Sequence, residues 1–157
     1  ITAIDESETL LSPLMGLRLT DGATEITEDG NLTLYTFNDK EGKKAFWHSS
    51  AHVLADAITS FYPDAKLTIG PAIENGFYYD IDFEDESLSE KDFKKIEDKF
   101  LEIARGKYEF KMRSVSKADA LDFYKKENNE FKIELIENLI DGDITFCDHR
   151  NFTDLCR

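Results

Sequence analysis

Length, composition and charge limit what this chain can be. It has 157 residues, with 19 Lys or Arg against 33 Asp or Glu, and a net charge of −14. That length admits one ordinary domain with a small appendage and excludes a large multidomain enzyme, while 41% apolar and 12% aromatic residues suffice for a packed core. Because nucleic-acid affinity comes largely from Lys and Arg that neutralise phosphates, the charge excludes broad docking on DNA or RNA.

The sequence indicates neither a membrane-spanning segment nor a set of disulfide bonds. No apolar run approaches the ~20 residues needed to cross a bilayer, and two Cys cannot form a disulfide framework. We therefore expect a cytoplasmic protein with reduced thiols and no membrane partner.

The first forty residues predict a small β-rich segment. Residues 31–37 follow an Asp-Gly turn and alternate apolar with polar side chains, which is typical of a strand. The polar stretch 38–44 comes next and contains a glycine. We place a domain boundary in this stretch, which divides the chain into residues 1–40 and 41–157.

One helix and two strands are predicted next. Apolar residues recur at helical spacing over residues 47–61, and Pro63 stops that pattern. Residues 66–69 and 77–83 indicate two strands, the second with clear alternation of apolar and polar side chains. Residues 70–76, with two glycines and a proline, are expected to form a long loop between them.

The remainder mixes helices and strands without regular alternation. Ser89 and Ser116, each followed three residues later by Asp, predict helix starts. Residues 131–140 fit either a helix or a strand. Three further strands are predicted, over residues 108–112, 144–147 and 152–156. We therefore predict an α+β fold with a mainly antiparallel sheet and packed helices.

Two histidines one helical turn apart are the most informative chemical feature. His48 and His52 lie at positions i and i+4 and project side by side from the predicted helix. At about 100° per residue they point away from the apolar stripe of that helix. Such a pair serves as surface histidines, as metal ligands or as an acid–base pair. A gluzincin-type protease is disfavoured, because Ser49 stands where its catalytic Glu would follow the first His.

The two cysteines differ in their surroundings. In the last predicted strand Asp154 and Cys156 share one face, and a carboxylate beside a thiol favours a cleft over a core. Cys147 and His149 fall in a polar, turn-like stretch, so we predict them as loop residues. Either cysteine could supply a third metal ligand to the histidine pair.

A tyrosine and a lysine complete the list of candidates. Tyr78 and Tyr79 place one ring on each face of their strand, and a Tyr beside paired histidines can donate its hydroxyl or stack on a base. Lys132 precedes the apolar Ile133 and would ordinarily be a solvated charge.

Three segments of the sequence are more informative together than any one of them alone. They are His48-Ser49-Ser50-Ala51-His52, then Ile69-Gly70-Pro71-Ala72-Ile73-Glu74-Asn75-Gly76-Phe77-Tyr78-Tyr79-Asp80, and finally Phe152-Thr153-Asp154-Leu155-Cys156-Arg157. In this order and at these separations they resemble the N-terminal editing region of bacterial threonyl-tRNA synthetases, over about residues 31–157. Residues 1–40 resemble the later part of the ubiquitin-like TGS domain that precedes it.

The resemblance implies a fold and an activity. The fold is the second additional domain type of threonyl- and alanyl-tRNA synthetases, preceded by a partial TGS domain. The activity is hydrolysis of seryl-tRNA mischarged by the synthetase, at the ester on the 3′ terminal adenosine. Serine differs from threonine by one methyl group, worth only about 1–3 kcal/mol of discrimination, so a second sieve is needed.

The resemblance also implies roles for individual residues. Its catalytic positions correspond to His48, His52, Lys132, Asp154 and Cys156, and its substrate contacts to Tyr79, Gly70 and Pro71. The two histidines would orient or activate water, and Lys132 would stabilise the oxyanion or contact the ribose. Asp154 would fix the amino group and Cys156 would shape the pocket.

Cofactors, partners and alternatives follow from the same comparison. ATP, Mg and Zn are expected only in the aminoacylation region of a synthetase, although zinc at His48, His52 and Cys156 stays open because alanyl-tRNA editing proteins hold it at these positions. The implied partners are the tRNA acceptor 3′ end, the seryl ester and the remaining synthetase domains. Two alternatives are a zinc-dependent aminoacyl-tRNA hydrolase and a non-catalytic module that binds the acceptor end. The family continues Gly-Pro-His after the position of Arg157, so we expect the chain to be cut within this motif.

Overall fold

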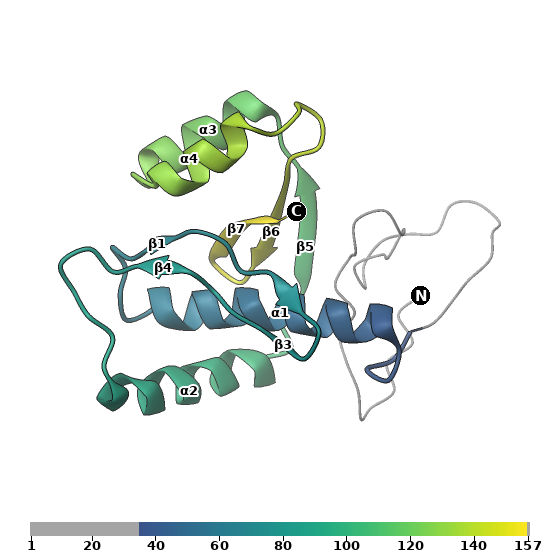
Figure 1. Cartoon of the computed structure of the whole chain (residues 1–157), viewed down its shortest axis with the longest axis vertical. Helices are drawn as coiled ribbons and strands as arrows, with labels where there is room; N and C mark the ends of the chain where they lie inside the picture. The colour runs from purple at the N-terminus through teal and green to yellow at the C-terminus, as the bar shows by residue number, and fades with distance from the viewer. Residues whose placement is uncertain (1–34, 157) are drawn as a thin grey trace.

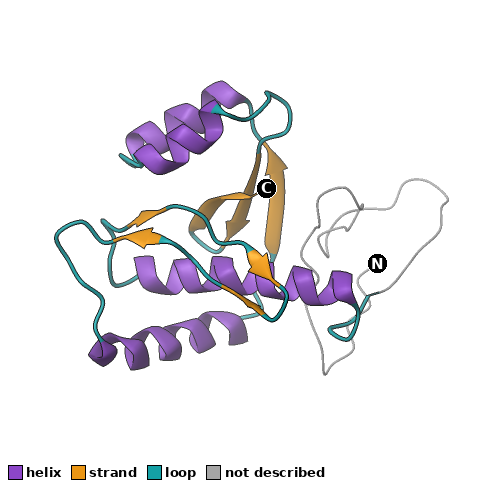
Figure 2. Cartoon of the chain, viewed as in Figure 1, coloured by secondary structure: helices purple, strands orange, loops and turns teal. Residues whose placement is uncertain are grey.

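The computed structural model describes residues 35–156. Within them, four helices and small antiparallel sheets form a mixed α+β fold, which confirms the predicted class (Figures 1 and 2). The more specific synthetase-type fold and the domain boundary stay predictions. The β-rich segment expected over residues 1–34 lies outside the described residues.

The strand predicted over residues 31–37 is wrong for residues 35–37, the part of it that the structure describes. Residues 35–37 are irregular and turning. The carboxylate of Asp39 accepts a hydrogen bond from the backbone N–H of Thr36 at 2.7 Å, which bends the chain just before the first helix.

Helix α1, Lys40–Thr59, crosses the centre of the molecule (Figure 1). The predicted helix is confirmed, although it begins earlier, inside the polar stretch. Gly42 is required there, since a Cβ at this position would lie 2.0 Å from the carbonyl oxygen of Thr36. Fully buried alanines let other elements approach the helix closely: Ala45, Ala51, Ala55 and Ala57.

Two short antiparallel pairs follow α1. Strand β1, Lys66–Leu67, pairs with β4, Ile81–Asp82. The strands predicted over residues 66–69 and 77–83 are therefore shorter than expected, and Phe77 belongs to a separate strand. The loop expected between them is only partly a loop. It contains a small hairpin of β2, Ala72–Ile73, and β3, Gly76–Phe77, because Gly76 adopts φ 143°, which permits a tight turn.

Helix α2, Glu90–Arg105, packs along α1 and closes one core. Its predicted start is confirmed, since the carboxylate of Asp92 accepts from the backbone N–H of Ser89 at 2.9 Å. The buried residues of this core come from both helices and the turn after α1: Val53, Ala57, Ile58, Tyr62, Ile96 and Ile103.

A three-stranded antiparallel sheet, ordered β5-β6-β7, forms the other part of the fold. Its strands are β5, Phe110–Ser114, β6, Thr145–His149, and β7, Phe152–Cys156. The pairing sets Cys147 opposite Asp154 and Thr145 opposite Cys156. The two last predicted strands are confirmed, and the register fixes which side chains of β7 face α1.

Helices α3, Lys117–Lys126, and α4, Glu130–Glu137, pack on each other beside this sheet (Figure 1). The segment that fitted helix or strand is therefore helical. Asn129 explains this, because its side chain accepts from the backbone N–H of Lys132 at 3.0 Å and caps α4. The second core contains Ala120, Tyr124, Ile136, Leu139, Ile144 and Phe146.

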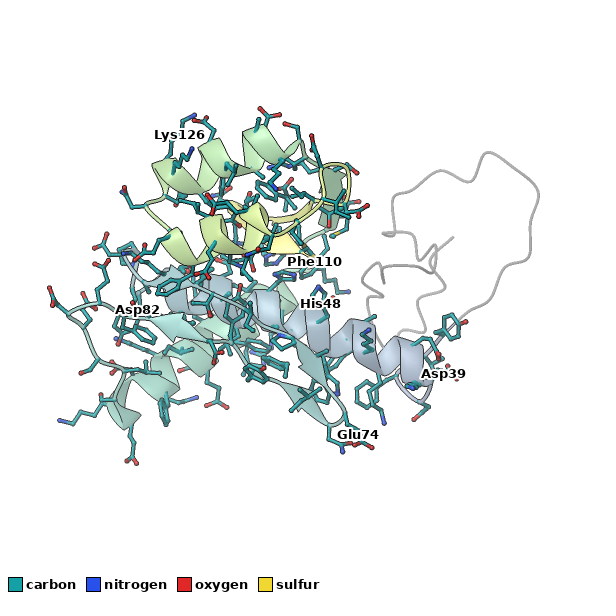
Figure 3. All side chains as sticks on the ribbon, turned by 45° about the horizontal axis from the view of Figure 1, so that its top comes forward. Asp39, His48, Glu74, Asp82, Phe110 and Lys126 are labelled. Carbon is teal, nitrogen blue, oxygen red and sulfur yellow. The ribbon has the colours of Figure 1, made fainter. Side chains whose placement is uncertain are left out.

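The two cores leave the middle of α1 facing polar side chains. Figure 3 places His48 there, between the labelled Asp39 at the start of the helix and the sheet that carries Phe110. No helix among the described residues combines the length and the apolar character that a membrane span requires.

Candidate active site

Helix α1 brings the two imidazoles together. His48 and His52 lie one turn apart with ring centroids 4.8 Å apart and planes at 82°. Their Nε2 atoms are 3.3 Å apart. His52 is buried at 3% exposure, whereas His48 is half-buried. The predicted side-by-side arrangement is therefore present, and it faces strand β7.

Strand β7 supplies a partner to each histidine. Period-two alternation points Asp154 and Cys156 toward α1. The Sγ atom of Cys156 lies 2.9 Å from Nε2 of His48, and Oδ2 of Asp154 lies 3.1 Å from Nδ1 of His52. Because a carboxylate only accepts, Nδ1 of His52 donates in this contact. In its neutral form His52 therefore keeps Nε2 as an acceptor toward His48.

Asp154 is the centre of the polar network. Its carboxylate is 1% exposed and forms an ion pair with Lys132, Nζ to Oδ1, at 2.7 Å. The hydroxyl of Tyr79 donates to Oδ2, and that of Tyr124 donates to Oδ1 at 3.4 Å. Burial alone would raise the pKa of Asp154, but Lys132 and the hydrogen bond from His52 outweigh it and hold the pKa well below its usual range.

Lys132 is buried, contrary to the usual fate of a lysine. It is 2% exposed and donates to the hydroxyl of Tyr79 at 3.2 Å. Asn129 fixes the first turn of α4 and also donates to the carbonyl of Leu67 at 2.9 Å, which ties this helix to β1. The ammonium is thus held in place by the backbone around it. Removing either partner of such a pair costs about 3–5 kcal/mol.

Tyr79 and the loop before it form a wall of the site. A Cβ at position 70 would lie 2.3 Å from the ring of Tyr79, so only glycine lets the ring pack against that loop. Gly70 and Pro71 line a cavity of about 430 Å³ together with both histidines, Tyr79, Lys132 and Asp154. All the site residues predicted from the sequence line this cavity, with the exception of Cys156. Cys156 contacts His48, which does line it.

His48 and the thiol of Cys156 are both neutral near pH 7. Burial and the neighbouring His52 lower the pKa of His48 to about 4. Burial, followed by the charge of Asp154, raises the pKa of Cys156 to about 12. A nucleophilic Cys needs a thiolate held by a nearby cation. This arrangement therefore disfavours covalent thiol catalysis and favours a neutral imidazole that can accept a proton.

The same three donor atoms partly fit a metal ion. The ring nitrogens and the thiol lie within 4.8 Å of one another. A tetrahedral zinc separates its N and S ligands by about 3.3–3.6 Å. The two Nε2 atoms meet this spacing at 3.3 Å, while the 2.9 Å contact of His48 with Cys156 would have to widen. The contact of His52 with Asp154 matches the carboxylate support common behind zinc-bound histidines.

Sequence reasoning missed two residues at this site. The hydroxyl of Tyr124 contacts Asp154 and accepts from the backbone N–H of Leu155 at 2.7 Å. Its helical spacing indicated a core position, and only the three-dimensional packing reveals the hydroxyl contact. Lys44 lines the cavity from the polar stretch at the start of α1. Its spacing of four residues before His48 was a usable signal.

The prediction of Cys147 and His149 as loop residues is wrong. Both are buried in β6, at 1% and 2% exposure. Their polar neighbours suggested a turn, but the antiparallel pairing with β5 continues through His149. Nδ1 of His149 lies 3.3 Å from Oδ2 of Asp56, away from the other two histidines.

Comparison with known proteins gives relatives of one kind. No protein-family model matches the chain. It is 68% identical over 134 residues to a threonine--tRNA ligase of Flavobacterium johnsoniae, covering 85% of this chain and 20% of that relative. For the enzyme of Flavobacterium psychrophilum the identity is 64% over 135 residues, with 86% and 20% covered.

A more distant relative extends the match along the chain. The threonine--tRNA ligase of Azobacteroides pseudotrichonymphae is 43% identical over 152 residues, which cover 96% of this chain and 24% of the relative. The chain thus spans about a fifth to a quarter of the length of the curated relatives it matches. It is homologous to a segment of bacterial threonine--tRNA ligases.

Proposed function

We propose that the cavity hydrolyses the ester of seryl-tRNA at the 3′ terminal adenosine, as an editing site of a threonyl-tRNA synthetase. The observation that carries this is the convergence of two imidazoles on a cavity supported by the buried pair of Lys132 and Asp154. The homology to a segment of threonine--tRNA ligases supports an ester of tRNA as the substrate. A ligase for threonine needs a second sieve, since one methyl group gives only about 1–3 kcal/mol of discrimination.

His48 is the proposed general base. In the reaction the water oxygen attacks the ester carbonyl carbon and its proton passes to the unprotonated ring nitrogen of His48. The bond from that carbon to the adenosine oxygen then breaks, and the same proton returns to this oxygen. Serine and a free 3′ end result. An imidazole with its pKa lowered to about 4 is unprotonated throughout the neutral range, as a general base must be before the reaction.

His52 and Asp154 act as positioning residues. The contact of Asp154 with Nδ1 fixes the ring of His52, whose Nε2 in turn faces Nε2 of His48 at 3.3 Å. The family comparison suggested that Asp154 binds the substrate amino group. We assign it this positioning role instead, because its carboxylate is 1% exposed and already contacts four side chains. These are Lys132, Tyr79, His52 and Tyr124.

Lys132 and Tyr79 are the proposed electrostatic partners of the reacting ester. Nζ of Lys132 and the hydroxyl of Tyr79 lie 3.2 Å apart and both line the cavity. The preorganised ammonium of Lys132 stabilises the negative charge that develops on the carbonyl oxygen, an effect worth about 3–4 kcal/mol for one donor in other hydrolases. The hydroxyl of Tyr79 donates to Asp154 and accepts from Lys132, so it positions the ammonium. The neutral thiol of Cys156 contacts Nε2 of His48 and so helps to hold this ring in place.

Serine release from seryl-tRNA tests the proposal. The wild-type chain and a version extended by Gly-Pro-His should both be assayed, with threonyl-tRNA as the second substrate. We expect faster hydrolysis of the seryl ester, and a loss of about 10²-fold or more in His48→Ala. A matched variant at an exposed lysine, Lys125→Gln, should keep full activity. Inert wild-type and extended chains would reject the proposal, as would an unchanged rate in His48→Ala.

The zinc-dependent alternative rests on the 3.3 Å separation of the two Nε2 atoms and on the nearby thiol. When bound there, zinc would supply an activated water or polarise the ester carbonyl. Stoichiometric zinc by elemental analysis, together with loss of hydrolysis on chelation and recovery on adding zinc, would favour it. Tight tRNA binding without turnover would instead favour the non-catalytic binding module.

A further inference from the structure

A second cavity lies at the N-terminal end of α1. Its volume is about 580 Å³, between the start of the helix and the β2–β3 hairpin. Figure 3 shows both borders, since Asp39 and Glu74 are labelled at the same end of the molecule. The lining residues are Asn38, Lys40, Lys43, Lys44, Trp47, Ala72, Ile73, Glu74 and Asn75.

This cavity is positively charged in an acidic chain. Three lysines line it against one carboxylate, that of Glu74, while the whole chain carries −14. Within residues 35–156 none of these three lysines forms an ion pair. Other lysines of the described part do so, among them Lys66 with Glu84 at 2.6 Å. Among the described residues the ammonium groups of this cavity thus have no carboxylate partner and can meet an anion.

The basic cavity is continuous with the candidate active site. Lys44 and Ala72 line both cavities. Lys40, Lys44 and His48 follow one another at four-residue intervals, so they lie along one face of α1. About 12 Å of helix rise separates Lys40 from His48, the length of three to four stacked nucleotides.

Apolar side chains form part of the cavity wall. Trp47 lines it one turn after Lys43, and Ile73 is 51% exposed at the hairpin. Lys43 is held over the ring of Phe37, with Nζ 5.5 Å from the ring centroid. Lysines beside an aromatic and an exposed aliphatic side chain are the combination that binds single-stranded nucleic acid, phosphates on the charges and bases on the apolar surface.

We propose that this cavity binds the phosphates of the single-stranded RNA immediately 5′ of the nucleotide whose ester enters the active site. Lys40, Lys43 and Lys44 contact the phosphodiester chain, and Trp47 with Ile73 supports a base. The inference rests on the proposed function, because it takes the ester of the terminal adenosine to lie at His48. It also explains how a chain of charge −14 holds an RNA end, through a local strip and not a broad surface.

Charge removal away from the catalytic cavity tests this inference. Neither Lys40 nor Lys43 lines that cavity, so the double variant K40Q/K43Q is informative. For seryl-tRNA we expect its KM to rise about tenfold or more. The slope of log(kcat/KM) against log salt should become shallower by about 1.4, since each single-strand phosphate contact contributes about 0.7. Hydrolysis of O-seryl-adenosine, which has no phosphate, should be unchanged.

The matched control removes two exposed lysines elsewhere. K91Q/K125Q has the same net charge as K40Q/K43Q, and both of its positions are exposed on α2 and α3. It should keep the wild-type KM and salt slope. Equal effects in both double variants would show that only net charge matters and would overturn the inference.

A binding assay separates this inference from the proposed function. A short single-stranded RNA ending in adenosine, labelled at its 5′ end, can be titrated at low salt by fluorescence anisotropy without any hydrolysis. We expect K40Q/K43Q to weaken its binding about tenfold relative to K91Q/K125Q. Unchanged RNA binding overturns the inference even if seryl-tRNA is hydrolysed, and so does equal binding of an acidic peptide. Weakened RNA binding without hydrolysis of O-seryl-adenosine rejects the proposed function alone.

Discussion

Two buried histidine–aspartate pairs join α1 to the three-stranded sheet, and they differ in almost everything around them. His52 and Asp154 lie in a cavity with Lys132 and Tyr79. His149 and Asp56 are equally buried. Yet the imidazole of His149 stacks on Phe110 at 4.5 Å between ring centroids, and neither residue lines any cavity of the site.

The two pairs also differ in hydrogen bonding. Nδ1 of His52 is aligned on Oδ2 of Asp154. Nδ1 of His149 lies 3.3 Å from Oδ2 of Asp56, yet neither atom has a well-aligned hydrogen-bond partner among the described residues. The same two residue types, equally buried, therefore do not suffice to form a reactive site. An aligned pair at a cavity can position a reacting group, whereas a misaligned pair in a core contributes to packing.

The largest expected effect is that of Asp154→Asn. Loss of the carboxylate releases His52 and leaves the ammonium of Lys132 unpaired, so we expect the single-turnover rate of serine release to fall about 10³-fold, with a loss of stability of about 3–5 kcal/mol. The double variant Asp154→Asn/Lys132→Met removes the unpaired charge. It should regain stability in urea denaturation without regaining activity. Recovery of hydrolysis in the double variant would contradict the role of the pair.

The next effect is a pH dependence of stability. Burial and His52 lower the pKa of His48 from 6.5 to about 4 in the folded chain. Between these values the unfolded chain binds more protons, so the free energy of unfolding should fall by about 3 kcal/mol as the pH drops from 6.5 to 4. Urea denaturation across this range measures it. His48→Gln should remove that share of the dependence, and an identical slope in this variant would contradict the assignment.

A smaller effect is expected at the other pair. His149→Gln loses the stack on Phe110 and removes the imidazole beside the carboxylate of Asp56, which keeps Arg150 as a neighbour at 3.5 Å, so we expect a loss of about 1–2 kcal/mol in stability. The rate of serine release per folded molecule should stay at the wild-type value. A large loss of hydrolysis here would show that the distinction between the two pairs is wrong.

The smallest expected effect is that of Tyr124→Phe. Removing the hydroxyl takes away one contact of Asp154 and leaves the N–H of Leu155 without its acceptor. We expect a loss of about 1 kcal/mol in stability and a few-fold lower kcat, with KM unchanged. A change confined to KM would instead place Tyr124 in substrate binding.

Much of the fold is predictable from local sequence signals. The helix that carries both histidines, the caps at Ser89 and Ser116, and the last two strands all follow from periodicity and turn chemistry. The hairpin inside the expected loop does not, because two-residue strands carry no periodic signal. Residues 131–137 are helical because Asn129 caps α4, which the apolar spacing of residues 131–140 did not reveal.

Some features of the candidate site also follow from the local sequence, whereas others do not. Local spacing placed His48 beside His52, and Asp154 on the same face as Cys156. Long-range packing alone determines that Lys132 is buried against Asp154 and that His149 belongs to a strand, since both facts depend on contacts between segments distant in the sequence.

Matched substitutions at the two buried pairs separate a reactive site from a structural contact. Asp154→Asn and Asp56→Asn make the same chemical change at the two buried pairs, and single-turnover serine release from seryl-tRNA can be measured for both at equal amounts of folded protein. We predict a loss of about 10³-fold in Asp154→Asn and a rate within twofold of wild type in Asp56→Asn. Equal rates in the two variants would contradict the claim that the cluster around His48, His52 and Asp154 hydrolyses the ester.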